Sequence, residues 1–264
     1  MNFSRIAALI QRHGYLYRRS APRLMEIFFW PLMDLLVWGF ITLYFAQSQI
    51  VLPRFVTFFL GALILWDILY RAQQGISISF LEEVWSKNLL NLFVSPMRPC
   101  EFLVALMTIS VAKMLVAGAA SAVVAWFFYS FNFFIIGISL IPFVFNLLIM
   151  GWAIGIISMS AILRYGQQAE VLAWGLGFLI QPFAAVFYPV SVLPGWIQPI
   201  AHIIPASHIF EGMRAVLENG IIPYRELGIA LFLNGIYLSA SIYFFYYNLR
   251  VVKEKGLLLH RGVE

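Results

Sequence analysis

Two ionisable side chains lie four residues apart in a long apolar stretch of the sequence. Asp67 and Arg71 fall within residues 56–78, and their spacing places them on one face of a helix, where they can form an ion pair. A further carboxylate, Asp34, follows Pro31 in the preceding apolar stretch. Ionisable groups at membrane depth are costly, so they usually face protein or water. The pair is therefore either a polar element of a transport pathway or a structural ion pair whose two charges only neutralise each other.

The sequence carries none of the short motifs that would assign an enzymatic reaction. It has no G-x-x-x-x-G-K-[ST] loop, no H-E-x-x-H and no cysteine–histidine cluster, so we expect neither a nucleotide site nor a metal site in this chain. The four histidines are scattered, and no nucleophile elbow is present. We therefore predict that the chain has no catalytic residues and no cofactor of its own.

Long apolar stretches predict the elements that must position these side chains. They occupy residues 24–46, 56–78, 102–128, 133–162, 171–188 and 227–248. A helix of about 20 apolar residues crosses the hydrocarbon core of a bilayer. The chain is 62% hydrophobic and only 11% charged, whereas a soluble domain carries about 25% charged residues. The sequence thus predicts an all-α polytopic membrane protein with six transmembrane helices, organised as one transmembrane domain over residues 1–264.

Basic residues are distributed unevenly between the two sides of these predicted helices. Six crossings place both termini on one side, and that side receives most of the arginines and lysines, whereas the other has Arg54, Arg214 and Arg225. The positive-inside rule therefore predicts cytoplasmic termini. Because the basic residues flank predicted spans, we attribute the net charge of +5 to orientation in a bilayer and expect no nucleic-acid partner. The lone cysteine, Cys100, allows no intrachain disulfide.

Three segments have the pattern of interfacial elements. Residues 1–23 contain an amphipathic helix, whose apolar face we expect to lie on the membrane with its arginines toward anionic lipid. Residues 81–100 contain a short amphipathic helix that ends before Pro96. Residues 189–225 are rich in proline yet apolar, which predicts an external re-entrant hairpin followed by an amphipathic helix over residues 206–218.

Together these features resemble the permease subunits of the ABC-2-type exporter family, which includes exporters of polysaccharides, drugs and nodulation factors. The resemblance rests on the segment EEVWSKNLLNLFVSP between the second and third predicted spans, on the segment PVSVLPGWIQPIAHIIPASHIFEGMRAVL before the last span, and on the six-span plan. The residues that match the family's external hairpin pattern are Pro189, Leu193, Pro194, Trp196, Pro205, Glu211 and Arg214.

The resemblance implies a division of labour between this chain and other chains. Two copies would form a homodimer in the cytoplasmic membrane of a prokaryote, with a pathway lined by spans 1, 2 and 5. Two copies of a separate cytosolic ATPase would bind ATP and Mg²⁺ and contact the coupling helix within residues 81–100. The expected coupling contacts are Val84, Trp85, Leu89, Leu92 and Phe93. The candidate pathway residues are Phe29, Trp30, Trp38, Tyr44, Asp67 and Arg71.

Two other classes of function stay open. An integral membrane enzyme acting on lipid-linked substrates would need several polar residues converging at one membrane face. A channel or transporter independent of ATP would need more intramembrane ionisable residues or a paired repeat. The sequence shows neither feature. The substrate is equally open between glycan, lipid and drug, since aromatic residues gather at both interfaces of any membrane protein.

Overall fold

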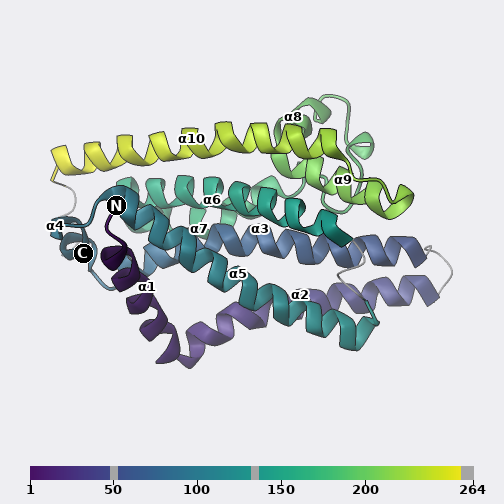
Figure 1. Ribbon diagram of the computed structural model, residues 1–264, viewed down its shortest axis with the longest axis horizontal. Coiled ribbons are helices and arrows are strands. Elements are labelled where there is room, and N and C mark those ends of the chain that lie inside the picture. The colour runs from purple at the N-terminus through teal and green to yellow at the C-terminus, as the bar shows by residue number, and fades with distance from the viewer. Residues whose placement is uncertain (48–52, 132–136, 257–264) are drawn as a thin grey trace.

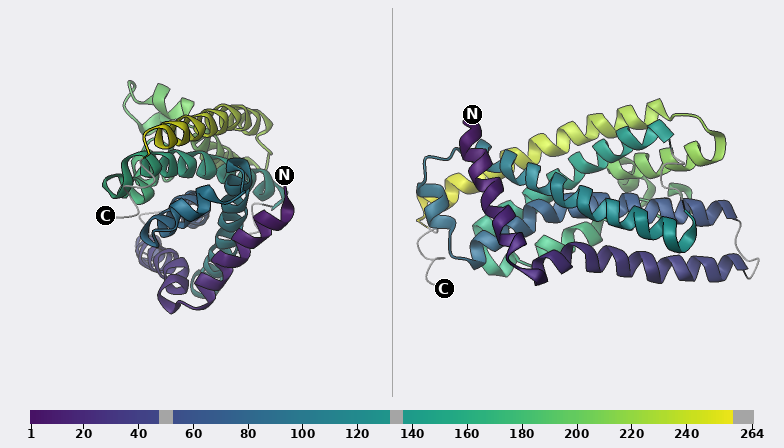
Figure 2. Two further views of the ribbon diagram at one scale, coloured as in Figure 1. Left: turned by 90° about the vertical axis from the view of Figure 1, so that its left-hand side faces the viewer. Right: turned by 60° about the horizontal axis from the view of Figure 1, so that its bottom comes forward.

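The computed structural model is a bundle of long helices that run side by side along one axis (Figures 1 and 2). The structure describes residues 1–47, 53–131 and 137–256, which contain helices and no strand. The helices long and apolar enough to cross a membrane are α2 (Ala21–Gln47), α3 (Pro53–Trp85), α5 (Pro99–Tyr129), α6 (Leu140–Tyr165) and α10 (Tyr224–Glu254). They confirm the prediction of an all-α polytopic membrane protein. Residues 133–136 of the fourth predicted span lie outside the described residues.

Shorter helices lie at the two ends of the bundle. They are α1 (Phe3–Arg18), α4 (Leu89–Val94), α7 (Leu172–Ile180), α8 (Gln198–Ile203) and α9 (Pro205–Asn219), with 3-10 turns at Gly166–Ala169 and Val190–Val192. Figure 1 shows α1, α4 and the last turn of α10 at one end, and α8 and α9 toward the other. We refer to these as the α4 end and the α9 end.

Helix α3 lies at the centre of the bundle because its apolar side chains find partners on several sides. Helices α5 and α6 pack along it (Figure 1). Two glycines of α6 permit a close approach of the backbones: a Cβ at Gly151 or Gly155 would lie 2.6 or 2.7 Å from the carbonyl oxygen of Leu69 or Gln73. These glycines therefore serve packing within the chain.

The fifth predicted span, residues 171–188, is not a continuous helix. Helix α7 has nine residues, and turns follow it as far as Tyr188. It ends at Ile180, two residues before Pro182, which has no backbone N–H to donate a helical hydrogen bond. The segment still carries the chain from the α4 end, where α6 ends, toward the α9 end (Figure 1). Within the described residues, five of the six predicted spans are thus long helices, whereas the fifth is a short helix with an irregular extension.

The amphipathic helix near the N-terminus packs on the protein with the face that we expected to lie on lipid. Ile6, Leu9 and His13 are buried, and the two aliphatic side chains join an apolar core with α5 and the end of α3. Asn2 caps α1 by accepting a hydrogen bond from the Ser4 backbone N–H at 3.0 Å. Figure 2 shows α1 crossing the α4 end of the bundle obliquely. Its apolar face is therefore covered by protein.

Candidate functional site

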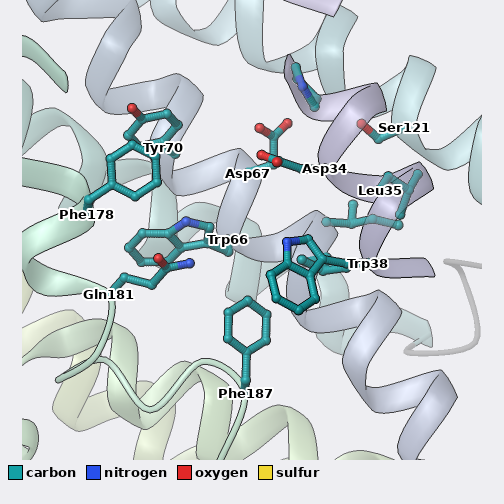
Figure 3. Close-up of a pocket in the computed structure, with 13 residues that line it drawn as sticks. Asp34, Leu35, Trp38, Trp66, Asp67, Tyr70, Ser121, Phe178, Gln181 and Phe187 are labelled. Carbon is teal, nitrogen blue, oxygen red and sulfur yellow. The ribbon is translucent and has the colours of Figure 1, made fainter. Parts of the chain in front are cut away.

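A cavity of about 280 Å³ lies midway along the bundle, between α2, α3 and the segment that begins with α7 (Figure 3). Its walls are formed by Pro31, Asp34, Leu35, Trp38, Leu63, Ile64, Trp66, Asp67, Tyr70, Ser121, Phe178, Gln181 and Phe187. Helices α2 and α3 are the first two predicted spans, and α7 begins the fifth. The cavity is therefore lined mainly by the three spans that the resemblance assigns to the pathway, together with Ser121 of α5.

The predicted ion pair lies beside this cavity. Asp67 Oδ1 accepts a hydrogen bond from Arg71 Nε at 3.0 Å, and Arg71 Nη1 donates to Gln74 Oε1 at 2.8 Å. Asp67 Oδ2 and Ser121 Oγ are buried and have no hydrogen-bond partner among the described residues. Asp34 adds a second carboxylate. The cavity wall therefore contains two buried polar atoms without a hydrogen-bond partner among the described residues.

Aromatic rings form much of the remaining wall. Tyr70 and Phe178 pack with ring centroids 4.9 Å apart. Figure 3 shows the indoles of Trp38 and Trp66 and the ring of Phe187 on one side of the two carboxylates. Of these rings, the sequence prediction named only Trp38. It missed Tyr70 and Phe178 because contacts between segments more than 100 residues apart leave no local pattern, and it did not name Trp66 or Phe187.

The other predicted pathway aromatics do not line this cavity. Phe29, Trp30 and Tyr44 lie exposed on α2, and the first two contact each other edge to face at 5.4 Å between ring centroids. Helix α2 buries few of its side chains within one chain. These aromatic residues are therefore available to lipid or to a second copy.

The coupling segment is shorter than expected, and its apolar face points inward. Helix α3 continues to Trp85, the chain turns at Lys87 (φ 53°), and α4 spans only six residues. Val84, Leu89 and Leu92 are buried in the chain's own core. They therefore offer no surface to a partner in this conformation, in contrast to the expectation from sequence.

The outward face of this segment belongs to other residues. Val94 is 75% exposed and Leu90 36% exposed. Trp85 is 47% exposed and stacks on Trp174 at 6.4 Å between ring centroids. Phe93 is half-buried against Phe102. We call Trp85, Leu90 and Val94 the coupling surface.

A cluster of charged groups connects this surface to α1. Glu83 is fully buried and accepts hydrogen bonds from Arg12 of α1 and from Asn88 Nδ2, the latter at 2.7 Å. The neighbouring carboxylate, Glu82, accepts from Tyr17 Oη at 3.1 Å. His13 lies between the two carboxylates, with ring nitrogens 3.5 and 3.3 Å from their oxygens. The sequence does not reveal this cluster because its members come from two predicted elements, residues 1–23 and 81–100, that are distant in the sequence.

The charge of His13 depends on this cluster. Burial alone would lower the pKa of His13, but the nearby carboxylates of Glu82 and Glu83 outweigh burial and the repulsion from Lys113, so its pKa is raised above the ordinary value. A histidine whose pKa is higher in the folded state stabilises that state fully below its unfolded pKa. The stabilisation is lost as the pH rises through the folded pKa.

We therefore expect α1 to pack less firmly against the end of α3 as the pH rises from about 6 to above the folded pKa of His13. A spin label at the exposed Gln11, in a Cys100→Ser background, should become more mobile over this range by electron paramagnetic resonance. The same label in a His13→Gln chain should lose most of this dependence. Equal pH dependence in both chains would contradict the role of His13.

At the α9 end, two predicted residues hold the irregular extension of α7. Arg214 Nη2 donates to the carbonyl oxygens of Ala185 and Tyr188, the latter at 2.6 Å. Glu211 Oε1 accepts from the Val190 backbone N–H at 2.7 Å and lies 3.1 Å from Arg214 Nη1. Burial lowers the pKa of Arg214 and Glu211 counteracts it, so the guanidinium stays charged. The irregular backbone therefore has hydrogen-bond partners within the protein, as membrane depth requires.

The remaining hairpin residues shape the chain around these contacts. Pro205 begins α9 and is buried, whereas Trp196 is exposed at the tip. Pro189 and Leu193 flank the 3-10 turn at Val190–Val192, and Pro194 follows it. None of these five residues lines the central cavity.

Comparison with known proteins decides the family. The sequence profile described as "ABC-2 type transporter" matches residues 5–217, which is most of the chain. This chain belongs to the ABC-2 type transporter family. A segment of 111 residues is also 26% identical to ABC transporter G family member 20 of Dictyostelium discoideum. That alignment covers 42% of this chain but only 15% of the relative's length.

Membership defines the chain as a membrane subunit of an ABC transporter. With five apolar helices in the part of the chain that the structure describes, this member is a multi-pass membrane protein. The profile covers the segments that form the central cavity, the coupling surface and the Glu211–Arg214 contact.

Proposed function

We propose that this ABC-2 type subunit moves an amphipathic, glycan-type or lipid-type substrate out of the cytoplasm, powered by a separate ATPase. The observation that carries this proposal is the cavity lined by α2, α3 and the α7 segment, with polar atoms left unpartnered at membrane depth. Unpartnered polar groups in such a place usually serve a transported ligand. Two copies of the chain pair with two copies of the ATPase, which binds ATP and Mg²⁺.

The ATPase docks at the α4 end, which we orient toward the cytoplasm. Both termini then lie in the cytoplasm of a prokaryotic cell, as the distribution of basic residues supports. The coupling surface of Trp85, Leu90 and Val94 is apolar and exposed, so it suits a groove on the ATPase. Motion of this surface reaches α1 through Asn88, Glu83 and Arg12.

The second copy faces α2. Along this helix the large side chains of Phe29, Trp30 and Tyr44 are exposed within one chain. An exposed apolar face of this kind is covered either by lipid or by protein. Pairing through α2 encloses the cavity between two subunits and makes a continuous path for substrate.

The direct test is affinity purification of the chain from its native membranes, followed by mass spectrometry. We expect a stoichiometric ATPase with a phosphate-binding loop. A preparation without an ATPase, in mild detergent and after crosslinking, would contradict the proposal and favour a membrane enzyme or an ATP-independent channel.

Variants of α4 sharpen this test. We expect Leu90→Asp with Val94→Asp to reduce ATPase recovery about tenfold or more, because charges then replace the apolar contact. The matched control is Leu92→Ala in the same helix, which should lower thermal stability by about 2–4 kcal/mol while ATPase recovery per folded chain is retained. If Leu92→Ala reduced ATPase recovery and the double aspartate variant did not, the contact with the ATPase would instead involve the buried residues of this segment.

A further inference from the structure

The walls of the central cavity carry more negative than positive charge. Figure 3 shows the carboxylates of Asp34 and Asp67 close together at the cavity, and no basic residue is among the described residues that line it. Asp67 is paired with Arg71 at 3.0 Å, but Asp34 has no ion pair within the described part of the chain. One carboxylate is thus left without a counter-charge at mid-depth of two spanning helices.

Two buried oxygen atoms of the cavity wall have no hydrogen-bond partner within the described ranges of the chain. Asp67 Oδ2 is buried without a partner in the described residues, and so is the hydroxyl oxygen of Ser121, whose residue is only 2% exposed. Figure 3 shows Ser121 on the side of the cavity where the two carboxylates lie. A carboxylate oxygen can only accept hydrogen bonds, and a hydroxyl can also accept. The unfilled positions therefore call for a donor or a positive charge.

Aromatic faces complete the arrangement. Trp38, Trp66 and Phe187 gather on one side of the carboxylates, and Tyr70 and Phe178 pack together nearby. The face of an aromatic ring attracts a cation, most strongly for tryptophan and when water is excluded. A volume of about 280 Å³ accommodates a small ring-bearing ligand. Aromatic walls with an uncompensated carboxylate match an organic ammonium ion better than an anion.

We propose that the central cavity binds an organic cation with an apolar or aromatic body, its ammonium group between Asp34 and the indoles of Trp38 and Trp66. This assignment rests on the proposed transport function and names the substrate class for it. Asp67 and Ser121 accept hydrogen bonds from the ammonium N–H groups or from ligand hydroxyls. Arg71 holds Asp67 in place and keeps the site from accumulating a second negative charge.

The test is binding of phenyltrimethylammonium to the full-length chain in nanodiscs, measured by equilibrium dialysis against empty nanodiscs. We expect saturable binding that benzenesulfonate and the neutral isostere tert-butylbenzene do not displace. Asp34→Asn should weaken binding about tenfold, and Trp38→Leu by a similar factor. The matched control is Glu218→Gln, which removes one exposed carboxylate near the end of α9 and should leave binding unchanged.

Three outcomes would overturn the cation assignment. They are equal binding by wild type and Asp34→Asn, displacement by tert-butylbenzene, and saturable binding of methyl glucoside that is unaffected by Asp34→Asn. A circular-dichroism melting curve matching wild type excludes misfolding of the variants. The binding assay needs no ATPase, so a negative result contradicts the cation assignment and not the transport role. Absence of an ATPase in the purification contradicts the transport role and not the binding of a cation.

Discussion

Replacing Arg214 with alanine is expected to lower the unfolding temperature of the purified chain by about 10 °C. The guanidinium donates to the carbonyl oxygens of Ala185 and Tyr188, and it lies 3.4 Å from that of Val186. Ala185 is fully buried, so its carbonyl oxygen has little access to water. Without Arg214 these carbonyls lose their donor where water is scarce, at a cost of about 1–3 kcal/mol each.

A second cost comes from Glu211. This carboxylate would keep its hydrogen bond from the Val190 backbone N–H but lose its counter-charge. The Glu211 side chain is 32% exposed, so the loss of its partner costs less than the about 3–5 kcal/mol typical of a fully buried ion pair. Because the carbonyl and carboxylate effects share one side chain, the double variant Glu211→Gln with Arg214→Ala should lose less stability than the sum of the single variants.

The measurement is fluorescence-detected size-exclusion chromatography after heating in detergent. Arg214→Lys should fall between wild type and alanine, because an ammonium group keeps the charge but has no planar fork. The matched control is Arg225→Ala, which removes an exposed arginine at the same end and should change little. An Arg214→Ala chain that melts within about 2 °C of wild type would show that the irregular segment does not depend on this guanidinium.

Replacing Glu83 with alanine is expected to release α1 and loosen the coupling segment together. This carboxylate is fully buried and accepts hydrogen bonds from Arg12 on one side and Asn88 on the other. Its loss leaves both donors without their acceptor, a local cost of about 3–5 kcal/mol. The effect should concentrate at the α4 end, because α6 and α10 pack on each other independently of this cluster.

Hydrogen exchange at one fixed pH tests this expectation. Amides of residues 3–18 and 86–95 should exchange at least tenfold faster in Glu83→Ala, while those of α6 stay protected. The matched control is Glu254→Ala, whose exposed carboxylate lies 3.9 Å from Arg250 and contributes about 0–1 kcal/mol. Faster exchange in α1 alone, with residues 86–95 unchanged, would show that Glu83 does not connect the two elements.

Local sequence features determined most of the helices. Long apolar runs predict spanning helices because an unpaired backbone group is too costly in lipid, and five such runs became long helices. The four-residue spacing of Asp67 and Arg71 predicted their ion pair, which forms at 3.0 Å. The amphipathic helix predicted over residues 206–218 forms as α9, and Gly220 caps its end with a φ of 69° that suits glycine.

Periodicity could not determine what an apolar face contacts. Leu89 and Leu92 share an apolar face, which suggested a ridge for a partner, but the chain's own core covers it. Ile6 and Leu9 of α1 likewise contact α5 where we expected lipid. An apolar stripe on a helix indicates that burying this face is favourable. It does not indicate whether protein, lipid or a partner covers the face.

Only the tertiary structure decided how the chain combines these elements into sites. The central cavity joins Asp34 and Asp67 to Phe178 and Phe187, and the α1 cluster joins His13 to Glu83. The family pattern singled out Glu211 and Arg214, but their contact with the broken fifth span is visible only in the fold. The physical reason is that propensity and hydropathy act over a few neighbouring residues, whereas a cavity or a buried charge cluster depends on packing between distant segments.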